Sequence, residues 1–230
     1  MHKLIIIVEG DVDKVIFAEL LKILKYNQYQ ILIGSEGVED PSAKGRDAVI
    51  NSLKDHINNK IFRDIYLALD LDNKSEKQLF TYVEKRCSGI MHPVAAGSYQ
   101  AGETRIRIIP IGLRNDKTLK KWSISKNQAE DYLFKLILEK DIFNHLHKKF
   151  PACIKKNLNY EKALYKMKEM QNLLSKQNLI ADNSKIYLEF FAAISAWIVS
   201  PATLTKKIFA HCSDELIRTT FQNILSRLND

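Results

Sequence analysis

Apolar runs of strand length alternate with amphipathic segments through the first half of the chain. Residues 4–8 are continuously aliphatic, and residues 12–26 then place apolar side chains at the three- and four-residue spacings of a helix. The alternation recurs twice, with strands expected at 29–33 and 64–69 and helices at 47–57 and 75–86. Three consecutive strand–helix units predict a parallel sheet that is covered by helices on both faces.

The pattern changes after the third unit. Residues 91–112 are expected to form a loop or hairpin and then a fourth strand at 106–111. From Gln128 onward the periodicity is helical only, with helices expected at 130–147, 160–176, 186–199 and 214–228. We therefore expect an α/β domain over residues 1–120, with a mostly parallel four-stranded sheet flanked by helices. An all-helical C-terminal region over residues 121–230 should pack on or beside it.

Composition places the chain among ordinary globular proteins. Hydrophobic residues make up 46% and charged residues 27% of its 230 residues, so the chain can bury a sizeable core. The three cysteines lack the paired spacing of a zinc site or a disulfide framework. The longest uncharged run, residues 190–205, is broken by Pro201 and too short to span a bilayer, and the first residues do not resemble a signal peptide. These features predict a cytoplasmic protein without a membrane partner.

Positive charge is concentrated toward the C-terminal end. The formal net charge is +8, of which residues 121–230 carry +6. Basic stretches with interleaved aromatic residues are typical of proteins that bind a phosphate backbone, although a solvated lysine face gives the same pattern. The candidate nucleic-acid-binding residues are Arg105, Arg107, Arg114, Lys117, Lys120, Lys121, Lys148, Lys149, Lys155 and Lys156.

Acidic residues follow two of the expected strands directly. Glu9 ends the first strand, and Asp70 and Asp72 end the third, where their two-residue spacing on an extended segment should point both to one side. Asp13 lies one helical turn beyond Glu9. Ligand sites of parallel α/β sheets lie at the carboxyl ends of the strands, so neighbouring first and third strands would gather four carboxylates. Such a repulsive group normally persists around a hard cation, which here would be Mg²⁺ or Mn²⁺.

Each acid also has a purely structural interpretation. Asp13 in the first turn of a helix is stabilised by the helix dipole. Asp72 could begin a turn or cap the helix that starts near Ser75. Glu9 is the hardest to explain in this way, because a carboxylate between five aliphatic residues and Gly10 contributes little to solubility alone.

The order of these motifs resembles the TOPRIM domain of topoisomerases, bacterial primases and nucleases of the overcoming-lysogenization-defect (OLD) family. The sequence LIIIVEGDVD at residues 4–13 and LALDLD at residues 67–72 carry the resemblance, together with NQAEDY at residues 127–132. The similarity covers roughly residues 3–135 and is closest to the OLD-type nucleases and small stand-alone TOPRIM-like proteins. It implies a TOPRIM or Rossmann-like sheet.

The resemblance also implies roles for individual residues. Glu9 would be a metal ligand or general acid/base, Asp70 and Asp72 would be metal ligands, and these three form the expected catalytic set. In the OLD-type variant, Asp13 and Glu130 complete a second metal site. Glu130 equally fits the third helical position of a capping box that starts at Asn127. A catalytic lysine of the kind some OLD-type nucleases carry does not align here, and Lys185 and Lys117 are only guesses.

Together these features predict a Mg²⁺- or Mn²⁺-dependent nuclease that hydrolyses phosphodiester bonds of DNA or RNA. A phosphatase or nucleotidyl transferase of another α/β fold is one alternative, and a non-catalytic nucleic-acid-binding or regulatory protein is another. OLD proteins are typically fused to an ATPase, but the chain lacks a GxxxxGK[ST] motif, so an ATPase partner would act in trans. The apolar run at residues 187–199 is expected to be core or the face of a homodimer.

Overall fold

The structure, a computed structural model, describes residues 4–36, 44–59, 62–179, 181–196 and 199–229. The chain divides into two compact units, one of residues 1–111 and 223–230 and the other of residues 112–222. The first unit thus stops short of the expected boundary at residue 120, because its last strand ends at Ile111. It also includes the end of the chain, which the sequence had assigned to the helical region.

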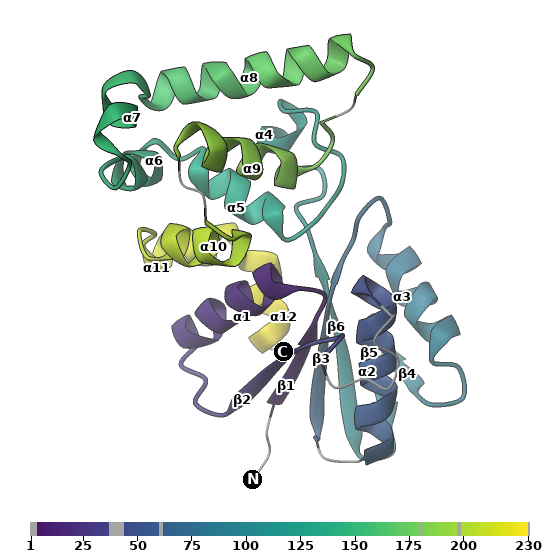
Figure 1. Ribbon diagram of the computed structural model, residues 1–230. Helices are drawn as coiled ribbons and strands as arrows, with labels where there is room; N and C mark the ends of the chain where they lie inside the picture. Colours follow the sequence, from purple (N-terminus) through teal and green to yellow (C-terminus); the bar gives the residue numbers. More distant parts are fainter. Residues whose placement is uncertain (1–3, 37–43, 60–61, 180, 197–198, 230) are drawn as a thin grey trace. The chain divides into compact units, whose positions relative to one another are not determined.

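A six-stranded mixed sheet, in the order β2-β1-β3-β6-β5-β4, forms the centre of the first unit (Figure 1). Four strands run parallel, namely β1 (Leu4–Val8), β2 (Tyr29–Ile33), β3 (Asp64–Asp70) and β6 (Thr104–Ile111). The antiparallel strands β4 (His92–Ala95) and β5 (Ser98–Ala101) extend it at the β6 edge. The predicted α/β class is confirmed, but the prediction of a four-stranded sheet is wrong, because the sheet has six strands. Gly97 and Gly102, both at positive φ, lie in the turns that build the added hairpin.

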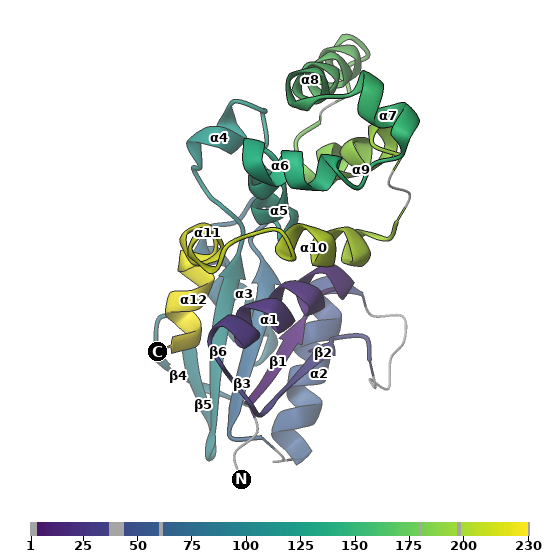
Figure 2. The ribbon, with the colours of Figure 1, turned by 90° about the vertical axis from the view of Figure 1, so that its left-hand side faces the viewer.

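Helices cover both faces of this sheet, as the sequence predicted (Figures 1 and 2). One face carries α1 (Asp11–Ile23) and α12 (Gln222–Asn229), and the other carries α2 (Gly45–Asn59) and α3 (Glu76–Arg86). On the α2 and α3 side, apolar residues of both helices form one buried cluster with alternate residues of the strands. The Tyr26 hydroxyl donates to the Leu228 carbonyl (3.1 Å), and Arg227 pairs with Glu76 (2.7 Å). These contacts explain why the end of the chain belongs to the first unit.

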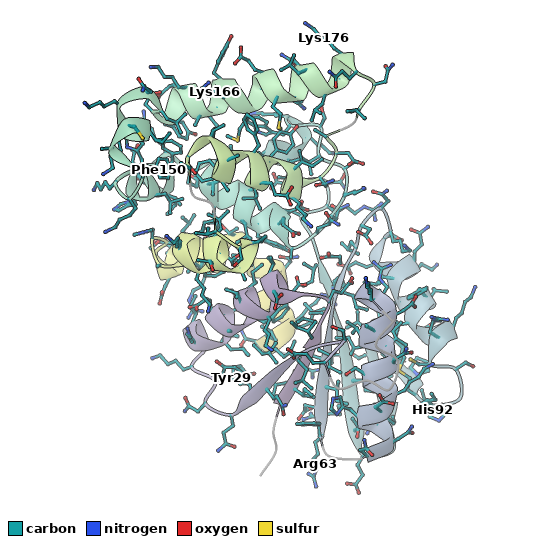
Figure 3. All side chains as sticks on the ribbon, in the orientation of Figure 1. Tyr29, Arg63, His92, Phe150, Lys166 and Lys176 are labelled. Carbon is teal, nitrogen blue, oxygen red and sulfur yellow. The ribbon has the colours of Figure 1, made fainter. Side chains whose placement is uncertain are left out.

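The second unit is helical throughout its described elements. These are α4 (Lys117–Lys120), α5 (Glu130–Ile137), α6 (Lys140–His147), α7 (Ala152–Asn157), α8 (Tyr160–Lys176), α9 (Ser184–Ile194), α10 (Pro201–Phe209) and α11 (Asp214–Thr220). Residues 131–134, 136 and 137 of α5 are buried, so this helix forms the centre of the unit. The long helix α8 has little buried surface, and Lys166 and Lys176 project from it (Figure 3).

The helical region was predicted correctly, but several of its helix boundaries were not. The expected helix 130–147 is interrupted at Glu139, whose backbone is extended, and 214–228 is interrupted at Phe221. The end of the expected helix 186–199 lies partly outside the described residues, and α9 ends at Ile194. Among the described helices, none is both long enough and apolar enough to cross a membrane.

Candidate functional site

The candidate site lies in the first unit, at the carboxyl ends of β1 and β3. These strands are parallel neighbours, with Ile7 opposite Leu67, as the sequence interpretation required. Glu9 follows the last residue of β1, and Asp70 is the last residue of β3. Parallel strands that start in register end at the same edge, so Glu9 and Asp70 are brought together there.

Glu9 is held in place by the backbone of the neighbouring strand. Its Oε1 accepts a hydrogen bond from the Asp70 N–H at 3.0 Å, and only 18% of its side chain is exposed. Burial raises the pKa of Glu9 above its usual value, although the Arg46 guanidinium, the Asp70 N–H and the Lys74 ammonium each act to lower it. Burial and the neighbouring cations thus act on the protonation of Glu9 in opposite directions.

Arg46, on the first turn of α2, lies among the acids. Its Nη2 donates to the Asp70 carbonyl and to Asp72 Oδ2, the latter at 2.9 Å, while its Nε lies 3.9 Å from Glu9 Oε1. Only 12% of the Arg46 side chain is exposed. One guanidinium therefore contacts the main chain or side chain of all three residues that the sequence placed in the catalytic set.

The sequence interpretation did not assign Arg46 to the site: it weighed Lys44-Gly45-Arg46 as a phosphate contact at a helix start and preferred a plain turn. The sequence Lys44-Gly45-Arg46 follows the second strand and opens the next helix, so topology places it at the same edge as Glu9. Gly45 has φ +55°, and a Cβ atom there would stand 3.4 Å from Glu9 Oε2. Glycine is therefore favoured at this position by its left-handed backbone, while the 3.4 Å distance itself is an ordinary contact.

A second layer of contacts supports Arg46 from α3. The guanidinium carbon stands 5.6 Å from the centre of the Tyr82 ring, within the range of a cation–π interaction. The Tyr82 hydroxyl donates to Asp47 Oδ1 at 2.6 Å, and Arg86 donates to the same oxygen at 2.6 Å. The side chain of Arg46 is thus packed between the acids and an aromatic ring.

Asp72 reaches the site by a different route from the one expected. The strand β3 ends at Asp70, and Asp72 has φ +49°, so the two residues are not on one extended segment. Aspartate tolerates this left-handed conformation better than most residues. The turn nevertheless directs the Asp72 carboxylate to Arg46, so this aspartate does belong to the site.

Asp13 lies in the first turn of α1, as expected, and there it accepts a capping hydrogen bond. It is the third residue of α1, and its Oδ2 accepts a hydrogen bond from the Gly10 N–H at 3.0 Å. The side chain is buried one turn after Glu9. Its role as a metal ligand stays a prediction.

Glu130 belongs to the second unit, where it is the first residue of α5 and not the third residue of a capping box. The pKa of Glu130 is raised above its usual value, chiefly by burial. The nearby Lys185 ammonium acts to lower this pKa, and the Glu189 carboxylate acts to raise it. Lys185 and Glu130 are therefore electrostatic neighbours within this unit. The adjacent Asp131, which the sequence interpretation passed over, is completely buried. The metal role of Glu130 stays a prediction from the resemblance.

The donor chemistry of Glu9, Asp70 and Asp72 fits Mg²⁺ or Mn²⁺, because oxygen ligands without imidazole or thiolate favour these hard cations. Arg46 acts as a stand-in cation among them. Across the described residues, however, no group of three or more His, Cys, Asp or Glu side chains is arranged so that it could hold a metal ion. A metal ion would therefore require the side chains around Arg46 to rearrange.

The candidate basic residues fall into two groups. Arg105 pairs with Asp64, and Arg107 donates to the Tyr66 hydroxyl, near the amino-terminal ends of the parallel strands, which Tyr29 and Arg63 mark in Figure 3. Asp70 lies six residues beyond Asp64 along β3, which is about 20 Å, so these arginines and the acids cannot hold the same phosphate. The other candidates are exposed residues of the second unit, namely Arg114, Lys117, Lys120, Lys121, Lys148, Lys149, Lys155 and Lys156.

Comparison with known proteins adds information about the fold alone. The chain matches no family model and no curated protein. Its structure is similar to the crystal structure of hypothetical protein PH0156 from Pyrococcus horikoshii OT3, with a TM-score of 0.60 and 15% sequence identity over 100% of both chains. At this identity the similarity extends to the architecture and not to the chemistry of the acidic edge.

Proposed function

We propose that the protein is a Mg²⁺- or Mn²⁺-dependent nuclease of TOPRIM type that hydrolyses phosphodiester bonds. One observation carries the proposal: the Glu9 and Asp72 carboxylates and the Asp70 main-chain carbonyl converge on a single cationic group, the guanidinium of Arg46, at the carboxyl edge of the sheet. In this proposal the four parallel strands are the TOPRIM-like core, and the hairpin of β4 and β5 is an addition to it.

The three acidic residues offer oxygen atoms of two kinds to the proposed site. Glu9 and Asp72 present carboxylate oxygens to Arg46, at 3.9 and 2.9 Å, and Asp70 presents its main-chain carbonyl at the end of β3. Divalent metal, when bound, would activate water and neutralise charge on the phosphate and leaving oxygen. Burial raises the pKa of Glu9, and a raised pKa suits a carboxyl group that accepts or returns a proton.

The experiment is cleavage of plasmid DNA, single-stranded oligonucleotides and RNA with Mg²⁺ or Mn²⁺. We expect Glu9→Gln, Asp70→Asn and Asp72→Asn each to lose about 100-fold or more of the rate, because each removes charge from the site. Asp64→Asn is the matched control, since Asp64 lies on the same strand at its other end. Cleavage that persists in all three site variants, or that Asp64→Asn abolishes equally, contradicts the proposal.

A non-catalytic nucleic-acid-binding protein is the second candidate, and the pairing of Arg46 favours it. The carboxylates already have an internal counter-ion, so the site does not need a metal ion to be stable. In that case the wild-type protein binds nucleic acid without cutting it under any metal condition, and Glu9→Gln leaves the affinity unchanged.

A further inference from the structure

We propose that Arg46 is a competing internal cation, which a divalent metal ion must displace from the acidic edge, and that Arg46 thereby sets the metal affinity of the site. This inference rests on the proposed function and concerns how the same site is controlled. It follows from the position of the guanidinium among Glu9, Asp70 and Asp72.

The first step is the geometry of the contacts. Arg46 Nη2 is 2.9 Å from Asp72 Oδ2 and also bonds to the Asp70 carbonyl, while Arg46 Nε faces Glu9 Oε1 at 3.9 Å. These are oxygen atoms of the kind that a hard cation uses as ligands. The guanidinium and a metal ion bound to Glu9 and Asp72 would therefore occupy overlapping space and use the same oxygens.

The second step is that Arg46 has limited exposure but a route out. Its side chain is 12% exposed and that of Asp72 is 39% exposed, so the Asp72 end of the pair faces solvent. Arginine has a long side chain with several rotatable bonds, and it can leave Asp72 without a change in the backbone of α2. The Tyr82 ring, 5.6 Å from the guanidinium carbon, remains as a partner for the cation.

The third step is that two cations competing for one set of oxygens are thermodynamically coupled. Removal of the internal cation must raise the affinity for the external one, since the metal no longer has to break the pairs of Arg46. Loss of Arg46 also leaves the largely buried Glu9 and the more exposed Asp72 without their counter-ion, so the metal-free variant should be less stable and should gain more from metal than the wild type does.

The test is calorimetric titration of Mn²⁺ into wild-type protein, Arg46→Gln and Arg105→Gln, without nucleic acid. Arg105→Gln is the matched control, because Arg105 also pairs with an aspartate of β3 but at the other end of the strand. We expect Arg46→Gln to bind Mn²⁺ about fivefold or more tightly than wild type. Its melting temperature should rise more on adding Mn²⁺, while Arg105→Gln should behave like wild type.

The possible results separate the two proposals. If wild type and Arg46→Gln bind Mn²⁺ with equal affinity, or Arg46→Gln binds it more weakly while circular dichroism shows it folded, Arg46 does not compete and this inference is wrong, whereas the metal site stands. If no protein binds Mn²⁺, the metal-dependent function itself fails, and this inference fails with it.

A second measurement covers the case in which Arg46→Gln does not fold. The Nε–H resonance of Arg46 in the wild-type protein can be followed by nuclear magnetic resonance during titration with Mg²⁺. We expect this resonance to shift in step with saturation of the metal site. A resonance that stays in place while Mg²⁺ binds overturns the inference.

Discussion

Two adjacent acids of α5, Glu130 and Asp131, differ in their surroundings although the sequence treats them alike. Asp131 is fully buried and accepts hydrogen bonds from the Leu113 and Gln128 N–H groups, at 3.2 and 3.1 Å, and from the Ser184 hydroxyl at 2.6 Å. Glu130, the first residue of the helix, is only partly buried. The resemblance directed attention to Glu130, and periodicity could not show that its neighbour organises the unit.

The buried Asp131 predicts a pH effect. Burial raises its pKa from the ordinary value of 3.8 to about 6, although its three hydrogen bonds lower it. Because the folded state holds the proton more tightly than the unfolded state, this contribution to stability is fully present below the unfolded pKa and is lost as pH rises through about 6. Asparagine resembles the protonated acid. We expect the stability of Asp131→Asn relative to wild type to rise by up to about 3 kcal/mol between pH 4 and 7.

Denaturant unfolding of both proteins over this pH range measures the effect. Wild type and Asp131→Asn share all other titrating groups, so their difference isolates this carboxyl. A difference that is constant from pH 4 to 7, or that falls as pH rises, contradicts the assignment.

Gly45 permits a prediction about the acidic edge. Alanine at φ +55° costs about 1–2 kcal/mol, and its methyl group would also stand 3.4 Å from Glu9 Oε2. We therefore expect Gly45→Ala to lower both stability and Mn²⁺ affinity. Gly89→Ala is the control, since Gly89 also has positive φ, +79°, but its Cβ would meet no atom within 4 Å. Calorimetry that shows equal Mn²⁺ binding in both variants would remove Gly45 from the site.

At the scale of elements, the sequence predicted strands and helices best where local pattern and tertiary environment agree. The strand at 29–33 and the helix at 160–176 have the predicted bounds, and α3 begins with a capping box at Ser75 and Gln78, where the helix over 75–86 was expected to start. The hairpin of β4 and β5 was recognised only as an alternative to a loop, because its strands are short and β4 is exposed.

The helix α10 shows why other elements were missed. Pro201 interrupts an apolar run and so was read only as a break in it, but in the structure it is the first residue of α10, after the N-cap Ser200. Proline is favoured at this position because it lacks an N–H that would have no partner there. A proline can therefore either interrupt an apolar run or begin a helix, and the sequence alone does not distinguish these two roles.

The connection between β2 and α2 depends on Gly34, which directly follows β2. A Cβ atom at Gly34 would lie 2.4 Å from the Val49 backbone nitrogen, so this end of β2 lies directly against α2. We expect Gly34→Ala to destabilise the first unit by about 1–3 kcal/mol through overpacking. Because α2 carries Arg46, the shift should also weaken the pair of Arg46 with Asp72.

Chemical denaturation measures this loss, with Gly10→Ala as the comparison. Gly10 has an extended backbone, and a Cβ there would meet only Asp13 Oδ2, at an ordinary 3.8 Å. If Gly34→Ala and wild type are equally stable, α2 shifts to accept the methyl group at no cost. The contact between Gly34 and α2 would then not determine the position of Arg46.

For the whole molecule, charge and candidate chemistry are divided between the two units. Residues 112–222 contain 19 Lys and Arg against 11 Asp and Glu, whereas the other unit contains 16 of each. The entire net charge of +8 therefore belongs to the helical unit. The sequence interpretation found the surplus but drew the boundary at residue 120, which left a net +2 in the first domain. The unit with the acidic edge has no formal net charge, so if the proposed function holds, long-range attraction of a phosphate backbone comes from the helical unit.

This division predicts which basic residues bind nucleic acid. Lys148, Lys149, Lys155 and Lys156 are exposed on the helical unit, whereas Arg105 already pairs with Asp64 and Arg107 with Tyr66. Fluorescence anisotropy with a labelled single-stranded oligonucleotide over a range of KCl concentrations separates the two groups. Replacing the four lysines by glutamine should flatten the slope of log K against log salt by up to about 3, since each lost phosphate contact removes about 0.7. The double variant Arg105→Gln with Arg107→Gln should change the slope little, because these side chains already have internal partners.

A larger change of the slope in the arginine variant than in the lysine variant would contradict this prediction. It would place the binding surface at the amino-terminal end of the sheet, about 20 Å along the strands from the acids. In that case a nucleic-acid strand that contacts Arg105 could reach Glu9 only by running along the whole length of the β-strands.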